Sequence, residues 1–385
     1  MKKFALIVLS FFTALSLYAQ QPVDKPLKVA VFAPMYLDSA FKGGMIGDFN
    51  IPRYVMPGVD FIQGAEIAFD TLSSYGQKIE GHLFDSKSAY YPVSWMIKYG
   101  RLNDMNLIIG SVKDPEYEEL AAFAAQKRIP FVSVTYPNSG GIRKDSFLII
   151  VNSTLKAHCE GIYSYLVQKH SLDNIYLVKR KNENRIENYF KEINAEEPKG
   201  LLKFKTLSFD SLNADVLRKS IDTSKPVVLI GATLYETFAL MLADAAYPIQ
   251  KNNKLVLIGM PNWDGFRDLY KKDRFSDFPI RVTTPHFDVK KNVFSSFLDN
   301  QYFTKYRTKP TDMAYKGFES VYYFVNILKN HPNDFMDHLN DDEYACFHTF
   351  NFRPVFLSNP TYPDFFENKH LFVMQILNGE LVWEN

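Results

Sequence analysis

The sequence predicts an α/β protein built from two doubly wound lobes, each a parallel sheet covered by helices on both faces. Short β-rich runs alternate with segments of helical period, and this alternation occurs twice along the chain. A β-α-β-α-β order requires a parallel sheet with helices on its faces. The length of 385 residues exceeds the usual size of a single core, so two domains are expected.

The first unit is predicted to contain strands at 27–34, 80–85 and 106–111 and helices at 57–72 and 94–104. Pro34 ends the first strand. The first helix is predicted because its apolar side chains share one face, namely Phe61, Ala65, Ala68, Phe69 and Leu72.

The stretch at 107–134 is a complete strand-helix-strand unit. We expect Asp114 to cap the helix, with Pro115 at its first position, and Tyr117, Leu120, Ala121 and Ala124 to form the buried stripe. A strand follows at 129–134. The loops 111–114 and 135–141 therefore leave the carboxyl ends of neighbouring strands, which is where open parallel sheets bind ligands.

The second unit repeats this order, with helices at 158–170, around 188–193 and at 234–246, and strands at 174–180, 226–232 and 254–261. Two further helices are predicted at 294–310 and 312–328. The segment 372–385 is predicted to be a hairpin that turns at Asn378 and Gly379.

The N-terminal segment predicts export. Lys2 and Lys3 precede an apolar run that ends near Tyr18-Ala19-Gln20, the pattern of a secretory signal over residues 1–19. The alternative, an uncleaved membrane anchor, needs about 20 apolar residues, and the run is shorter. No Cys follows it, so lipid attachment is not expected. We expect the mature chain to be periplasmic and not to span the membrane.

Composition excludes several classes of function. With 44 basic and 43 acidic residues, no bulk charge attracts nucleic acid or an anionic membrane. The mixed run KRKNENR at 179–185 is typical of a solvated loop. Cys159 and Cys346 could pair in an oxidising compartment. The eight His are scattered without a metal-binding spacing, so no metal or other cofactor is expected.

Signatures of catalysis are missing. The sequence has no phosphate loop and no nucleophile elbow, and the glycines of GGMIG at 43–47 lie too far beyond the strand for a dinucleotide site. His158 adjoins Cys159, but adjacent helical residues point about 100° apart. We expect a surface His and a buried Cys, and we read the carboxylates at 341–343 as a helix end. The protein is thus predicted not to be an enzyme, and an uncharacterised hydrolase is a weak alternative.

Five segments resemble the successive blocks of the type I periplasmic binding proteins, most of all the leucine/isoleucine/valine-binding components of ABC transporters. They are KVAVFAPMYLD, GVDFIQGAEIAFDTL, LIIGSVKDPEYEELAAFAAQKRIPFVSV, VVLIGATLYETFALMLADA and FTKYRTKPTDMAYKGFESVYYFVNIL. The resemblance implies two lobes joined by a three-crossover hinge. The N-terminal lobe would be 27–150 plus 284–335, and the C-terminal lobe 151–283 plus 336–385. It also implies a small-molecule ligand between the lobes and an inner-membrane ABC permease as partner.

The amino-acid clamp of the family is not visible. Only Ser111 remains of a run of small hydroxyl residues, and Val112 and Lys113 follow it. The positions of the second-lobe aromatics fall near Asn184 and Thr233, and that of the acid for the ligand ammonium falls near Pro261. The ligand is therefore not predicted to be leucine.

Ten residues are candidates for ligand contact. Tyr36, Tyr136, Tyr235 and Trp263 are predicted to wall the cleft, Ser111, Thr135, Asn138, Asn184 and Thr233 to orient polar groups, and Lys113 to meet an anionic portion. Each has an alternative interpretation as a solvated rim residue. Substituting Trp263 or Tyr136 by Ala is expected to weaken binding without unfolding the protein.

Three functions are consistent with these patterns. The leading hypothesis is an extracytoplasmic solute-binding protein that delivers a small polar, amino-acid-like ligand to a permease. The second is a binding module of the same fold that senses a ligand or regulates cell-envelope enzymes, and the third is the hydrolase. The ligand, the oligomeric state and the open or closed resting state are left open.

Overall fold

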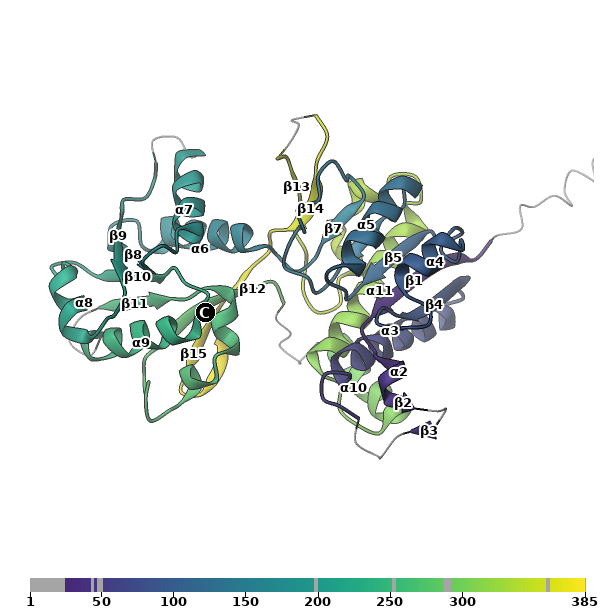
Figure 1. The fold of residues 1–385 in the computed structure, drawn as a ribbon, viewed down its shortest axis with the longest axis horizontal. Coiled ribbons are helices and arrows are strands. Elements are labelled where there is room, and N and C mark those ends of the chain that lie inside the picture. Colours follow the sequence, from purple (N-terminus) through teal and green to yellow (C-terminus); the bar gives the residue numbers. More distant parts are fainter. Residues whose placement is uncertain are drawn as a thin grey trace, which may run out of the picture.

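The computed structural model describes residues 25–42, 45–46, 51–196, 200–250, 254–286, 292–357 and 361–384. The predicted signal segment at 1–19 lies outside these residues. Two seven-stranded, mostly parallel sheets form two lobes that lie side by side (Figure 1). The predicted fold class is therefore confirmed. Within the described chain, no helix has the length and apolar character required to cross a bilayer.

The sheet of the first lobe has the order β13-β14-β7-β6-β5-β1-β4. Its strands are β1 (Leu27–Ala33), β4 (Ile79–Asp85), β5 (Leu107–Gly110), β6 (Phe131–Ser133), β7 (Leu148–Ile150), β13 (Phe352–Val355) and β14 (Phe365–Asn368). All neighbouring pairs are parallel except β13 with β14. A small pair, β2 (Phe41–Lys42) and β3 (Met45–Ile46), follows the short helix α2 (Leu37–Ala40).

Helices cover both faces of this sheet. The helices α3 (Met56–Ser74), α10 (Val293–Tyr306) and α11 (Asp312–Asn330) share one core with Val29 and Val31 of β1. The helices α4 (Val93–Lys98) and α5 (Glu116–Lys127) share the other with Ala30 and Phe32. Successive side chains of a strand point to opposite faces, so a strand covered on both sides must be apolar throughout.

Two glycines allow α3 and α11 to approach closely. A Cβ on Gly64 would lie 1.9 Å from the backbone oxygen of Ala314, and a Cβ on Gly317 would lie 2.0 Å from that of Phe61. No side chain fits either gap. The backbones of the two helices are therefore in contact through glycine at both positions.

The second lobe has the strand order β16-β15-β12-β11-β10-β8-β9 around a single core. Its strands are β8 (Asn174–Arg180), β9 (Phe204–Phe209), β10 (Val227–Gly231), β11 (Leu255–Ile258), β12 (Ile280–Thr284), β15 (Phe372–Leu377) and β16 (Glu380–Trp383). Its helices are α6 (Leu155–Lys169), α7 (Arg185–Glu196), α8 (Ala214–Ser220) and α9 (Glu236–Gln250). The predicted hairpin is confirmed, with Asn378 and Gly379 at φ 50° and 87°.

The chain passes between the lobes after β7, after β12 and after β14. The last crossing differs from the predicted boundary, which placed 336–385 in the second lobe. Strand β14 pairs in parallel with β7 and antiparallel with β13, so both belong to the first sheet. The buried carboxylate of Asp364 fixes this insertion, because it accepts hydrogen bonds from the backbone nitrogens of Lys144 (2.8 Å) and Leu357 (2.6 Å).

The start of α5 also differs from the prediction. The helix begins at Glu116, and no side chain caps it. Asp114 instead accepts a hydrogen bond from the hydroxyl of Tyr136, with its Oδ2 at 3.0 Å. The predicted buried stripe of Tyr117, Leu120, Ala121 and Ala124 is confirmed.

Candidate ligand-binding site between the lobes

The loops after β5 and β6 bring two predicted hydroxyl residues together on the first lobe. The hydroxyl oxygens of Ser111 and Thr135 lie 3.1 Å apart, and Asn152 donates to the backbone oxygen of Thr135 at 2.8 Å. This contact arises because the two strands are neighbours in a parallel sheet. The pair lies at the carboxyl ends of β5 and β6, the edge at which open parallel sheets bind ligands, and the side chain of Ser111 is buried there.

The next residues of the two loops make contacts of their own. The ring of Tyr136 packs edge-on against Tyr117 at a centroid distance of 4.9 Å, and its hydroxyl is held by Asp114. Lys113 is exposed. The side chain of Asn138 accepts a hydrogen bond from the backbone of Gly140 at 3.0 Å, so it also shapes its own turn.

The loop after β1 is held by a carboxylate that sequence reasoning missed. Asp85, at the end of β4, accepts hydrogen bonds from the backbone nitrogens of Met35 (2.9 Å), Tyr36 (3.1 Å) and Leu37 (2.7 Å). This contact accompanies the left-handed conformation of Tyr36 at φ 51°, whose ring packs edge-on against Tyr54. The pairing of β1 with β4 is the signal that relates Asp85 to this loop.

The rim of the second lobe is built around Glu183. This carboxylate accepts hydrogen bonds from the hydroxyl of Thr233 (2.9 Å) and from the backbone of Leu234 (3.3 Å). Tyr235 is 55% exposed, and the guanidinium carbon of Arg180 lies 4.5 Å from its ring centroid. Asn184 is exposed and accepts a hydrogen bond from the ammonium of Lys179. Thr233 is fully buried, so it supports this rim from inside, whereas Asn184 and Tyr235 are exposed just beyond the ends of β8 and β10.

Trp263 does not wall the cleft as predicted. Its side chain is fully buried, and its Nε1 donates to the backbone oxygen of Thr233 at 2.9 Å. The indole covers two glycines, because a Cβ would lie 2.4 Å from it at Gly231 and 2.3 Å from it at Gly259. Trp263 is thus a core residue that supports the loop of Thr233 from behind.

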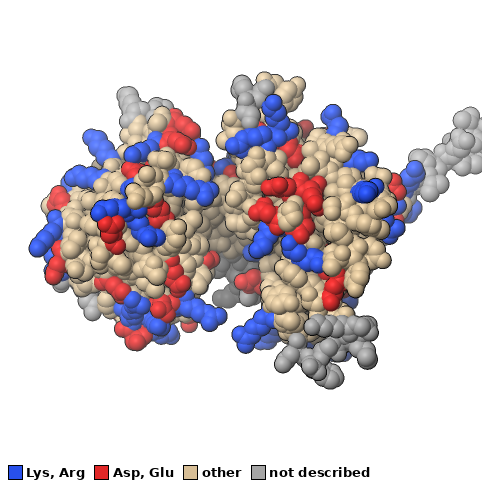
Figure 2. Space-filling view, viewed as in Figure 1, with Lys and Arg blue, Asp and Glu red and all other residues tan. Residues whose placement is uncertain are grey.

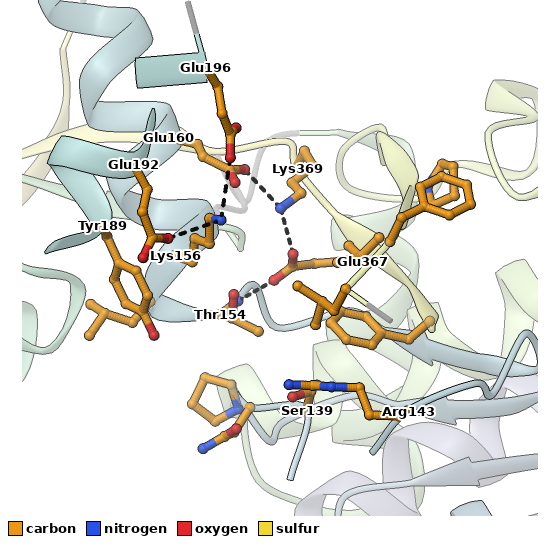
Figure 3. Close-up of a pocket in the computed structure, with 18 of the residues that line it drawn as sticks. Ser139, Arg143, Thr154, Lys156, Glu160, Tyr189, Glu192, Glu196, Glu367 and Lys369 are labelled. Carbon is orange, nitrogen blue, oxygen red and sulfur yellow. Dashed lines mark hydrogen bonds and ion pairs between the residues drawn. The ribbon is translucent and has the colours of Figure 1, made fainter. Parts of the chain in front are cut away.

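A pocket of about 530 Å³ lies between the lobes and is lined by both (Figure 3). Its lining includes Asn138, Ser139 and Arg143 from the first lobe, Thr154, Lys156, Glu160, Arg185, Tyr189 and Glu192 from the second, Glu367 from β14 and Lys369 from the third crossing. Among the predicted site residues, Asn138 is the one that lines it. A pocket of this size and polarity suits a small polar molecule.

Ion pairs connect the crossings at this pocket. Lys369 contacts Glu367 at 2.6 Å and Glu160 at 2.8 Å, and Glu367 also accepts a hydrogen bond from the backbone of Thr154 at 2.6 Å. Burial lowers the pKa of Lys369, but the carboxylates of Glu367 and Glu160 raise it by more, so the pKa is above its usual value. The first and third crossings are therefore tied together by ion pairs around the protonated ammonium of Lys369.

Two arginines line the pocket without a carboxylate partner. Arg143 donates to the backbone oxygen of Ile142, and Arg185 donates to the hydroxyl of Tyr189, both at 3.2 Å. Within the described part of the chain, neither guanidinium has a carboxylate at ion-pair distance. Figure 2 shows Lys and Arg side chains on both lobes beside the gap. Sequence reasoning missed both arginines, since Arg185 lies in the run interpreted as a solvated loop.

The His158–Cys159 pair is not arranged for nucleophilic catalysis. His158 is 2% exposed, which corrects the predicted surface position, and its Nδ1 lies 2.8 Å from the hydroxyl of Thr283. Burial lowers the pKa of His158 to about 3 and raises that of Cys159, so the imidazole is neutral and the thiol protonated. Both Cys159 and Cys346 are buried and free.

Two groups of His and acidic side chains among the described residues have the spacing of a metal site. His331, His338 and Asp341 are half-buried and lie after α11. His286, Glu319 and His348 lie where the second crossing reaches the first lobe.

Comparison with known proteins relates the chain to others through its structure. No family model matches the sequence, and no curated protein matches it. A solved structure of a putative branched-chain amino acid ABC transporter protein from Rhodospirillum rubrum is similar, with a TM-score of 0.65, 13% identity and coverage of 93% of this chain and 100% of that one.

Two further solved structures are similar over the same extent. An ABC transporter substrate-binding protein from Desulfitobacterium hafniense complexed with Leu gives a TM-score of 0.57 at 12% identity, covering 94% of this chain and 100% of that one. The branched-chain amino acid substrate-binding protein LivJ from Streptococcus pneumoniae, in complex with isoleucine, gives 0.53 at 17% identity, covering 93% and 98%. The chain therefore has the two-lobed fold of the type I periplasmic binding proteins, the family that its sequence segments resemble.

Proposed function

We propose that the protein is an extracytoplasmic binding protein that captures a small anionic molecule between its lobes. The observation that carries this proposal is the position of Arg143 and Arg185, which line one interlobe pocket from opposite lobes without carboxylate partners in the described residues. A guanidinium binds a carboxylate or phosphate through two parallel hydrogen bonds. Closure of the lobes would bring both groups onto one anion.

The remaining groups at the pocket and rims define the rest of the ligand. Tyr189 lines the pocket, and Tyr136 and Tyr235 lie at the rims, so an apolar or planar body is accommodated by aromatic contact. The Ser111–Thr135 pair and Asn138 offer neutral hydrogen-bonding groups. The carboxylates of Glu160 and Glu367 pair with Lys369, and those of Glu192 and Glu196 lie 3.4 and 3.9 Å from the ammonium of Lys156. Each carboxylate of the lining therefore has a cationic partner, unlike the two arginines. A small organic acid fits this set better than a zwitterion.

The fold and the sequence pattern support a proposal for the cellular role. Small-molecule binding proteins of this fold include substrate-binding components of ABC transporters, and the N-terminal segment has the pattern of a secretory signal. We therefore propose a periplasmic location and delivery of the ligand to an inner-membrane ABC permease.

The test is a thermal-shift panel of amino acids, organic acids and phosphorylated metabolites. A ligand at 100 times its Kd stabilises the folded state by about 2.7 kcal/mol. We expect at least one organic acid or phosphorylated compound to stabilise the wild type, and the Arg143→Ala/Arg185→Ala double variant to lose that shift. Arg101→Ala, which removes an exposed guanidinium on the first lobe outside the pocket lining, should retain it.

Two results would overturn the proposal. One is a panel in which no compound stabilises the protein, which would favour the sensing or envelope-regulatory module of the same fold. The other is a ligand whose affinity is unchanged in the double variant. Turnover of a panel compound would instead revive the hydrolase alternative.

A further inference from the structure

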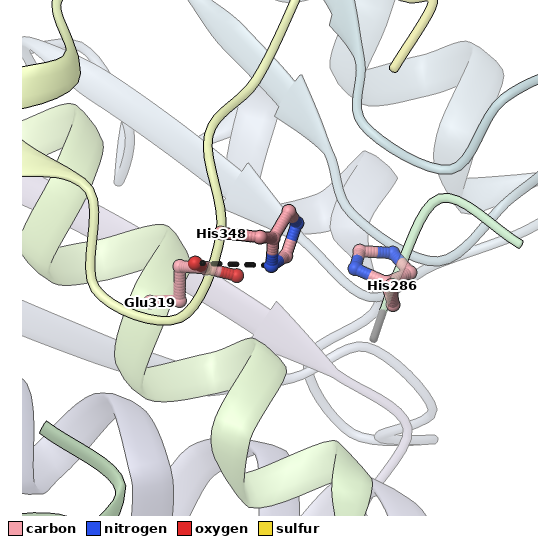
Figure 4. A group of neighbouring side chains, drawn as sticks. All are labelled: His286, Glu319 and His348. Carbon is pink, nitrogen blue, oxygen red and sulfur yellow. Dashed lines mark ion pairs between the residues drawn. The ribbon is translucent and has the colours of Figure 1, made fainter. Parts of the chain in front are cut away.

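Three side chains from separate parts of the chain meet where the second crossing enters the first lobe (Figure 4). His286 follows β12, Glu319 belongs to α11, and His348 lies in the segment before β13. One ligand atom from each of the three lies within 4.8 Å of the others. This cluster is separate from the interlobe pocket that contains the two arginines.

The imidazoles of this cluster lack hydrogen-bond partners. Neither ring nitrogen of His286 or of His348 has one among the described residues, although all four atoms are buried. The side chain of His348 is 5% exposed and that of Glu319 is 4% exposed, and their closest atoms, Nδ1 and Oε1, lie 3.5 Å apart. A buried polar atom without a partner is unfavourable in a folded protein, so the arrangement points to a bound species.

The donor set identifies the class of that species. Two imidazoles and one carboxylate are a frequent zinc set that leaves a fourth position open. An imidazole binds a metal through the lone pair of a ring nitrogen, and the ring nitrogens of His286 and His348 are buried without a competing hydrogen-bond partner among the described residues.

We propose that His286, Glu319 and His348 bind one Zn²⁺ ion at the junction of the lobes. All three line a pocket of about 300 Å³, which supplies room for a fourth ligand. Lys316 also lines this pocket, and its ammonium would repel a bound cation. The carboxylates of Asp264 and Asp312 line the pocket as well and offset the positive charge of Lys316.

The geometry requires a modest contraction. Zn–N and Zn–O bonds of about 2.0–2.2 Å place tetrahedral ligand atoms roughly 3.4 Å apart, so the longest separation, at most 4.8 Å, must shorten. His286 and His348 lie on connecting segments outside the strands, where such a shift is inexpensive. The bound ion would join the second crossing to α11 and so restrain movement of one lobe against the other.

The experiment titrates Zn²⁺ into chelator-treated full-length protein by calorimetry. The half-buried His331–His338 pair could bind zinc itself, so the titration uses the His331→Ala/His338→Ala variant as its background. We expect one Zn²⁺ per chain in that background, and a loss of at least about 100-fold in affinity when His286→Asn or His348→Gln is added. Glu319→Gln should also weaken binding. His82→Gln, which removes an imidazole of β4 outside the cluster, should leave it unchanged.

Loss of fold is separated from loss of the metal by two measurements. Circular dichroism checks each variant, and the visible absorption of Co²⁺ bound to the background protein reports tetrahedral nitrogen and oxygen ligation without a substitution at the site. The proposal is overturned if the background variant binds no Zn²⁺, if folded His286→Asn and His348→Gln variants bind it unchanged, or if the Co²⁺ spectrum shows only octahedral ligation.

Discussion

An aromatic residue just beyond a parallel strand can either line the cleft or pack into the core, and the local sequence does not distinguish the two. Trp263 was predicted to line the cleft, but its indole points into the core. The difference lies in Gly231 and Gly259, which leave the space that the ring fills. Neither glycine is adjacent to Trp263 in sequence, so its burial follows from the packing of β10 and β11.

Replacing this indole tests the assignment. We expect Trp263→Ala to lower the free energy of unfolding by about 3–5 kcal/mol, since it opens a cavity over two glycines and removes a buried hydrogen bond. Tyr235→Ala, at a side chain 55% exposed, should cost under about 1 kcal/mol. Urea unfolding of both variants measures this. Similar losses in the two variants would contradict the core assignment.

The low pKa of the buried His158 predicts that the free energy of unfolding depends on pH. Its pKa is about 3 in the folded protein, against 6.5 for an imidazole in the unfolded chain, so unfolding allows the uptake of a proton that the folded protein does not bind. The stability from the neutral imidazole is present above about pH 6.5 and is lost as the pH falls toward about 3. Thr283 and Lys369 face the ring and do not change protonation in this range.

The measurement compares urea unfolding at pH 7 and pH 5. In the wild type, His158 alone should lower the free energy of unfolding by about 2 kcal/mol between pH 7 and pH 5. The His158→Asn variant should lack this part of the decrease. Burial raises the pKa of Asp145 to about 6, so protonation of Asp145 stabilises the folded state as the pH falls from 7 to 5. This contribution is the same in both proteins and cancels in the comparison. An unchanged pH dependence in the variant would show that His158 is not held neutral by the fold.

At the scale of elements, the long helices were predicted well and their contacts were not. The apolar period predicts a helix at 57–72, and α3 spans Met56–Ser74. The period cannot say that Gly64 and Gly317 meet the backbone of the opposite helix, because that requires the pairing of α3 with α11. Glycine in a helix otherwise indicates only a position of low helix propensity.

This contact reverses the usual effect of Gly→Ala in a helix. At an exposed helical position the change stabilises by about 1 kcal/mol. At Gly64 or Gly317 the new Cβ would overlap a backbone oxygen at about 2 Å, so we expect each variant to lose more than about 2 kcal/mol. The control is Gly265→Ala, where no atom lies within 4 Å of a built Cβ. Thermal unfolding compares the three, and unperturbed Gly64→Ala protein would refute the close approach.

The two short strands at one end of the first sheet, β13 and β14, were not predicted, and the reason is physical. β13 and β14 have four residues each, Pro354 lies inside β13, and no helix separates the two strands. Their segment has neither a strand alternation nor a helical period long enough to be recognised. Their place beside β7 is fixed by contacts such as Ser153 with the backbone oxygen of Asn368 at 2.6 Å, and these contacts are not local in sequence.

At the scale of the whole molecule, sequence patterns indicate which strand ends are neighbours but not which side chains line the interlobe pocket. Neighbouring parallel strands place Ser111 and Thr135 together, and the sequence pattern is sufficient for that. The second-lobe partner Glu183 and the facing arginines at 143 and 185 depend on how the lobes are oriented by three crossings. That orientation is a long-range property, which local patterns do not contain.

Separate cores predict separate unfolding. One buried cluster fills the second lobe and two others fill the first, so the two-state approximation should fail for this chain. We expect scanning calorimetry to resolve two transitions, with Trp263→Ala lowering the temperature of one and Gly64→Ala that of the other. A single transition shifted equally by both substitutions would mean that the lobes unfold as one cooperative unit.

The late insertion of β14 also governs the order in which the polypeptide acquires its shape during synthesis. The backbone of Val151 meets Asn368, 217 positions further along, so a ribosome must produce nearly all of the intervening second lobe before the first sheet can be sealed. Until then the backbone of β7 is unpaired on one side and can form hydrogen bonds with strands of other nascent chains. A chaperone that covers this unpaired side would be most useful in that interval.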